Sequence, residues 1–75
     1  MANITDPILV NFGKNVQRYR IHQGLSQEKL AEKCELHKNY IGFIERAERR
    51  ISLSAAVKVA KGLNVELQIL IENNE

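Results

Sequence analysis

The chain has 75 residues, the size of one small domain, and its hydrophobic fraction of 44% and charged fraction of 27% are ordinary for a globular protein. Its net charge of +2 is unevenly spread, because residues 14–50 hold nine Lys or Arg and five Asp or Glu, whereas the segments on either side are each slightly acidic. The single cysteine, Cys34, excludes a disulfide within the chain and a metal site built from several thiolates.

The N-terminal residues MANITDPILV lack the basic segment and the apolar run of a signal peptide. No apolar run in the chain approaches the roughly 20 residues of a membrane-spanning helix. We therefore expect a cytoplasmic protein with no membrane partner. The basic middle of the chain hints at an anionic partner that docks there.

Asp6 and Pro7 predict the start of a first helix, because Asp is a favoured N-cap and Pro is well tolerated at the first helical position. Gly24 predicts its end, since Gly is common just past a helix C-terminus. Gly13, inside this helix, is expected to cost about 1 kcal/mol relative to Ala. The buried face is predicted from apolar residues that recur every three or four positions: Ile8, Phe12, Val16 and Tyr19.

Ser26 predicts the N-cap of a second helix, whose inward residues are Leu30, Ala31 and Cys34. Glu35 and Leu36 then form a brief turn, and a third helix is expected from about His37 or Lys38 to Arg46. Two short helices joined by a tight turn, here at about residues 26–46 of a basic protein, indicate a helix-turn-helix.

Residues 47–51 are polar and basic and predict a loop. Ser52 or Ser54 then caps a fourth helix with an inward stripe of Leu53, Ala56, Val57, Ala60 and Leu63. The end of the chain, NVELQILIENNE, fits either a helix or an alternating strand, and we favour the helix. The predicted fold class is therefore all-α, with four to five short helices.

The third helix has an inward side when it is drawn at 100° per residue, and this side carries Ile41, Ile44 and Glu45. A buried carboxylate without a partner costs on the order of several kcal/mol. Arg20, near the end of the first helix, is the natural partner through a bidentate ion pair. We predict that this pair is structural and joins the first helix to the third.

The opposite side of this helix carries Asn39, Phe43 and Arg46, with Gly42 beside them. In a major groove, Asn pairs with adenine, an aromatic ring presses on a thymine methyl group, and Arg holds phosphates. An isolated Phe more often packs in a core, so burial of Phe43 is the competing interpretation. Tyr40 lies on a flank, where packing and contact with a partner are equally consistent with the pattern.

The run GLSQEKLAEKCELHKNYIGFIERAERRISL resembles the helix-turn-helix of the Cro/C1 phage-repressor type, the XRE family, and the likeness extends over roughly residues 12–71. The part HKNYIGFIERAERRISL is similar to the recognition segment of restriction–modification controller proteins. The resemblance implies a lambda-repressor-like DNA-binding domain that occupies residues 1–75, with a C-terminal dimerisation segment at about residues 63–73. The positions that match the family pattern are Arg20, Gly24, Leu25, Gln27, Leu30, Ala31, Ile41, Ile44 and Glu45.

The resemblance also implies roles for single residues. Lys38 and Asn39 fall at the principal base-reading positions, and Gln27 is expected to contact a phosphate and to brace the recognition helix. Glu35 stands where the family prefers Gly or Asn, and Ala47 replaces the usual Gly, so a left-handed conformation at either position carries a steric cost. The residues that we predict to face DNA are Gln27, His37, Lys38, Asn39, Tyr40, Phe43, Arg46, Arg49 and Arg50. The residues implied at the dimer surface are Leu67, Ile69 and Leu70.

The leading hypothesis is a homodimeric, sequence-specific regulator of transcription that binds double-stranded DNA at a near-palindromic operator. The alternative is the antitoxin of a toxin–antitoxin pair, with the C-terminal segment as a strand across a dimer and a toxin protein as the main partner. The chain has no paired carboxylates, nucleophile–base pair or phosphate-binding loop, so we expect no enzyme activity. No cluster has the spacing of metal ligands, so we expect no metal and no cofactor.

Overall fold

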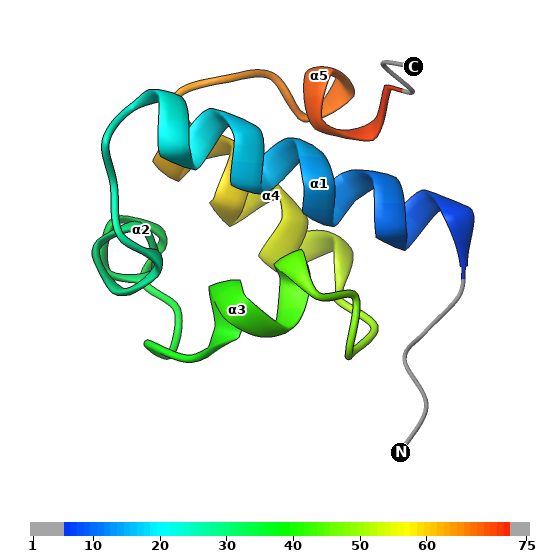
Figure 1. Cartoon of the computed structure of the whole chain (residues 1–75), viewed down its shortest axis with the longest axis horizontal. Coiled ribbons are helices and arrows are strands. Elements are labelled where there is room, and N and C mark those ends of the chain that lie inside the picture. Colours follow the sequence, from blue (N-terminus) through cyan, green and yellow to red (C-terminus); the bar gives the residue numbers. More distant parts are fainter. Residues whose placement is uncertain (1–5, 73–75) are drawn as a thin grey trace.

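The computed structural model describes residues 6–72 of the chain. These residues form five helices and no strand: α1 (Pro7–His22), α2 (Gln27–Cys34), α3 (Tyr40–Glu45), α4 (Leu53–Leu63) and α5 (Leu67–Ile71). α1 crosses the molecule between α3 and α5, and α4 packs against α2 and α5 (Figure 1). The all-α prediction is confirmed, and the C-terminal segment that fits both a helix and a strand is helical. No helix in the described part is long and apolar enough to cross a membrane.

Three of the helices begin at side-chain caps. Asp6, Ser26 and Ser52 each accept a hydrogen bond of 2.9–3.0 Å from a backbone N–H of the first turn that follows them. Pro7 occupies the first position of α1, as predicted, because its missing N–H is not needed there. Ser52, and not Ser54, is therefore the cap of α4.

The first four helices end in the same way, at a residue with a left-handed backbone. The φ angles are 73° at Gly24, 59° at Glu35, 54° at Ala47 and 60° at Asn64. In each case the following backbone N–H donates back to a carbonyl five residues earlier, which closes the helix end. Glycine adopts this conformation without a steric cost, whereas Glu35 and Ala47 carry the cost that the sequence predicts for them.

The core joins all five helices. Its fully or almost fully buried members are Phe12, Val16, Leu30, Ala31, Cys34, Ile41, Ile44, Ala56, Val59, Ala60, Leu63 and Leu70. Two predictions of burial are wrong, because Ile8 is 66% exposed and Leu53 is 73% exposed. Both residues lie in the first turn of a helix, where no other described helix covers them.

Close helix packing depends on two glycines. A Cβ on Gly13 would clash with the backbone oxygen of Ile44, so the contact between α1 and α3 requires a hydrogen at this position. A Cβ on Gly62 would likewise clash with the sulfur of Cys34, where α4 meets α2. The sequence predicts a helix-propensity cost for Gly13 in α1, and the structure adds the reason for a glycine there, which is the close contact with α3.

α5 is held by two asparagines of α1 that bind its C-terminal carbonyl groups. Asn15, which is 1% exposed, donates from Nδ2 to the backbone oxygens of Leu70 and Glu72, both at 2.8 Å. Asn11 donates to the oxygen of Glu72 at 2.6 Å and to that of Ile71 at 3.2 Å. Because carbonyls at a helix end have no partner within the helix, these bonds fix where α5 stops.

We expect Gly13→Ala to destabilise the protein by about 1–3 kcal/mol, because relief of the clash requires α1 and α3 to separate. Helix propensity alone predicts a gain of about 1 kcal/mol, so the two effects have opposite signs. Urea unfolding measures the difference. Lys14→Ala, at the exposed neighbouring position, is the control and should be nearly neutral, and a Gly13→Ala variant at least as stable as wild type would contradict the packing argument.

Candidate nucleic-acid interface

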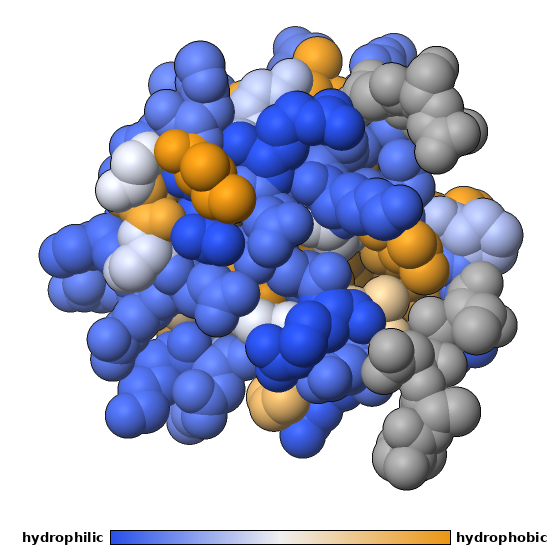
Figure 2. Space-filling view, viewed as in Figure 1, coloured by the Kyte–Doolittle hydropathy of each residue, from blue (hydrophilic) through white to orange (hydrophobic). Residues whose placement is uncertain are grey.

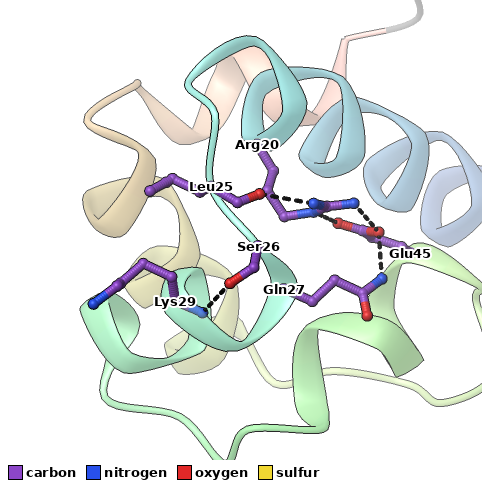
Figure 3. Close-up of polar contacts among 6 residues, drawn as sticks. All are labelled: Arg20, Leu25, Ser26, Gln27, Lys29 and Glu45. Atoms are coloured by element: carbon purple, nitrogen blue, oxygen red, sulfur yellow. Dashed lines mark hydrogen bonds and ion pairs between the residues drawn. The ribbon is translucent and has the colours of Figure 1, made fainter.

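A buried ion pair joins α1 to α3 (Figure 3). Arg20 donates from Nε to Oε2 of Glu45 at 2.6 Å and from Nη2 to Oε1 at 3.2 Å, so the pair is bidentate as predicted. Arg20 also donates from Nη1 to the backbone oxygen of Leu25 at 2.8 Å, and Gln27 donates from Nε2 to Oε1 of Glu45 at 2.8 Å. The Glu45 side chain is only 2% exposed, so its charge is compensated inside the protein.

Gln27 therefore braces α3 from the first residue of α2. Its amide nitrogen points at the carboxylate of Glu45 in Figure 3, and its side chain is half-buried. The bracing part of the predicted role is thus present in the structure. Contact between Gln27 and a phosphate stays a prediction.

α3 begins at Tyr40, two or three residues later than the sequence predicts. The segment before it forms a turn in which the backbone N–H of Asn39 donates to Nδ1 of His37 at 3.2 Å. The backbone N–H of Tyr40 donates to the oxygen of His37 at 2.9 Å, a three-residue spacing that belongs to the turn and not to an α-helix. Lys38 and Asn39 therefore precede the helix and are both exposed.

Several predicted DNA-facing residues line one hollow of about 320 Å³: His37, Asn39, Tyr40, Phe43 and Arg49. The surface over α3 and the turn before it is largely hydrophilic in Figure 2. Tyr40 is half-buried and packs against the core, and its contact with a partner stays a prediction. The inward side of α3 is as predicted, since Ile41 is 0% and Ile44 3% exposed.

Phe43 is half-buried and carries two arginines on its ring. The guanidinium carbon Cζ of Arg49 lies 4.1 Å from the ring centroid, and that of Arg46 lies 5.6 Å from it. Both distances are in the range of cation–π interactions. The ring is therefore not a core side chain, as the competing interpretation holds. It is partly covered by the two arginine side chains.

Arg46 and Arg50 have carboxylate partners. Arg46 Nε lies 3.0 Å from Oε2 of Glu48, and this hydrogen bond raises the pKa of Arg46 above its ordinary value. Arg50 Nη1 lies 3.7 Å from Oδ2 of Asp6, the N-cap of α1. Both arginine side chains are more than half exposed, at 52% and 75%, so phosphate groups can reach them.

Gly42 is buried, which corrects its predicted place on the outer side of α3. A Cβ there would lie 2.9 Å from Nη1 of Arg46 and 3.3 Å from Oε1 of Gln27. The side chains of Arg46 and Gln27 thus cover the backbone at this position. Glycine leaves them room to do so.

Within residues 6–72, no three His, Cys, Asp or Glu side chains are grouped so that they could hold a metal ion. Burial raises the pKa of the Cys34 thiol, and the nearby charge of Lys33 opposes this shift. A raised pKa keeps this thiol protonated and chemically inert at neutral pH.

The predicted dimer residues lie on α5 but differ in exposure. Leu70 is 0% exposed and packs in the core, so its assignment to a dimer surface is wrong. Leu67 and Ile69 are half-buried, and residue 73, the last of the predicted dimerisation segment, lies outside the described residues.

Leu67 also borders an apolar groove of about 310 Å³, whose lining includes Ile8, Phe12, Leu53, Ala56, Leu67 and Ile71.

Sequence reasoning missed three residues that shape this region. Glu48 is the partner of Arg46, and the alternating charges of ERAERR carry a weak signal for such a pair. Asn11 and Asn15 hold α5, and neither position carries a local signal, because their carbonyl partners lie 55 or more residues away in the chain.

Comparison with known proteins extends these observations. Residues 16–70 match the protein family described as helix-turn-helix. The control protein C.BamHI of Bacillus amyloliquefaciens is 40% identical over 70 residues, which cover 92% of this chain and 86% of that protein. The crystal structure of the restriction-modification controller protein C.AhdI from Aeromonas hydrophila aligns with a TM-score of 0.82 and 38% identity, over 87% of this chain and 98% of that one. SinR, a master regulator for biofilm formation solved in complex with DNA, aligns with a TM-score of 0.76 and 32% identity, over 81% and 98% of the two chains.

We expect Glu45→Ala to destabilise the fold by about 3–5 kcal/mol, because it leaves the guanidinium of Arg20 without its partner at a largely buried site. Thermal and urea unfolding measure this loss. Glu32→Ala is the matched control, because Glu32 pairs with Lys29 at 3.3 Å on the surface, with its own side chain 73% exposed. That variant should lose less than about 1 kcal/mol. Equal losses in the two variants would show that burial adds nothing to the Arg20–Glu45 pair.

Proposed function

The chain belongs to the helix-turn-helix family of the Cro/C1 (XRE) type, and on that premise we propose that it is a transcription regulator that binds specific double-stranded DNA sequences. The observation that carries the proposal is the placement of Lys38 and Asn39 on the exposed turn before α3, where Asn39 lines one hollow together with Arg49 of the loop after that helix. Their donor groups suit base edges in a major groove, while Arg46 and Arg50 suit phosphates.

A controller of a restriction–modification system is the more specific role that we propose. Its support is the similarity to two proteins that are named as control or controller proteins, both over more than 85% of this chain. The antitoxin alternative depends on a C-terminal strand, and the structure has the helix α5 in that segment. No described feature now favours a toxin as the partner.

We propose further that the protein acts as a homodimer and that the groove between α1, α4 and α5 is the surface where two copies meet. The support is apolar exposure: Leu53 is 73%, Ile8 66% and Ile71 49% exposed around one groove. Apolar residues gathered in this way commonly mark an interface. A symmetric dimer would carry two copies of α3 to half-sites about one helical turn apart.

Selection of bound DNA from a random pool tests the main proposal. We expect enrichment of a near-palindromic sequence with two half-sites about one turn of DNA apart. A pool that shows no enrichment over unselected DNA after repeated rounds would contradict sequence-specific binding. Enrichment of a single, unrepeated site would contradict the dimer.

Arg46→Gln should weaken binding to all sequences about equally and reduce the slope of log affinity against log salt by about one, because one phosphate contact is lost. Glu48→Gln should act in the opposite direction and raise affinity by up to roughly fivefold, since its carboxylate competes with phosphate for Arg46. Fluorescence anisotropy at several salt concentrations measures both. An unchanged salt slope in Arg46→Gln would exclude the phosphate contact.

Leu53→Glu should convert the dimer to a monomer, because it places a charge in the proposed apolar interface. Analytical ultracentrifugation measures the change. Ile21→Glu is the matched control, since Ile21 is 61% exposed but does not line the groove, and this variant should stay dimeric. Dimers of equal stability in the two variants would place the interface elsewhere.

A further inference from the structure

Arg49 has an exposed side chain in the loop that follows α3, yet its head group has a defined position. Its Cζ lies 4.1 Å from the centroid of the Phe43 ring. Within residues 6–72, Arg49 makes no hydrogen bond and no ion pair. The ring is therefore the group that orients this guanidinium in the described part of the chain.

A backbone hydrogen bond holds the loop against the end of α3. The backbone N–H of Glu48 donates to the oxygen of Phe43 at 3.0 Å, and the left-handed Ala47 turns the chain back over the end of α3. Cζ of Arg46 lies 5.6 Å from the same ring centroid, and Nε of Arg46 lies 3.0 Å from Oε2 of Glu48. The ring, the helix end and the loop thus form one local unit.

This unit borders the hollow that Phe43 and Arg49 share with His37, Asn39 and Tyr40. Arg49 and Asn39, one of the two predicted base-reading residues, therefore line the same hollow. An arginine side chain loses much rotamer freedom when it binds a partner, and prior orientation reduces that loss.

We propose that Phe43 is a positioning residue, which acts through Arg49 and does not itself contact a base. Arg49 is the group that touches DNA, and the Phe43 ring holds its guanidinium at the edge of the recognition surface. The inference rests on the proposed function for its DNA partner. It replaces the role predicted from the sequence, which is direct contact between the Phe43 ring and a thymine methyl group.

A double-mutant cycle tests the coupling between the two residues. Phe43→Leu keeps an apolar side chain but removes the ring, and we expect it to weaken binding of the selected DNA by roughly two- to fivefold. In an Arg49→Ala background the same change should have no effect on affinity. Phe43→Tyr keeps the ring and should bind as wild type does.

Arg50→Ala is the matched background, because Arg50 pairs with Asp6 and has no contact with the Phe43 ring. There Phe43→Leu should weaken binding by the same factor as in wild type. If Phe43→Leu weakens binding equally in the Arg49→Ala background, the ring acts on DNA directly or through the fold, and the proposal is overturned. Urea unfolding of each variant shows whether it is folded, and only folded variants enter the comparison of affinities.

A second measurement needs no DNA. Protons above an aromatic ring are shielded, so NMR of the DNA-free protein should show the Arg49 side-chain protons shifted upfield in wild type and in Phe43→Tyr. Phe43→Leu should abolish the shift. Wild-type Arg49 protons at ordinary positions would overturn the proposal, whether or not the protein binds DNA. Failure of the random-pool selection with the upfield shift present would instead count against the proposed function alone.

Discussion

The position of α3 depends on one buried carboxylate. α3 has six residues, too few to be stable alone, and its burial rests on Ile41 and Ile44. Apolar contacts of this kind have little directional preference, whereas Glu45 accepts hydrogen bonds from Arg20 and Gln27 at defined angles. We infer that this network sets the rotation of α3 about its axis, and with it the direction in which the outer side chains point.

Small residues complete this arrangement. Gly13 lets the backbone of α3 approach α1, and Gly42 leaves room for Arg46 and Gln27 over the helix. The loop after α3 then returns across its end through the left-handed Ala47. The result is a surface where a turn supplies exposed polar side chains on one side and a loop supplies arginines on the other.

The hollow lined by predicted DNA-facing residues and the apolar groove are made of different elements. The hollow uses the turn before α3, α3 itself and the loop after α3, and the groove uses α1, α4 and α5 with the residues just before α4. α1 connects them, because Arg20 binds Glu45 of α3 while Asn11 and Asn15 bind the end of α5. In a dimer formed at the groove, α1 would therefore help to set the distance between the two copies of the hollow.

Local signals in the sequence determined the helix caps, the all-α class, the helix-turn-helix and even the Arg20–Glu45 pair, because caps and helical periodicity act over a few residues and a buried charge demands a partner. Tertiary structure alone decided the rest. Leu70 is buried because two asparagines of α1 hold α5 against the core, and Leu53 is exposed because no described helix covers the start of α4. The need for glycine at position 13 is visible only when α3 is packed against α1. These outcomes depend on contacts between residues far apart in the chain, and no local pattern encodes such distances.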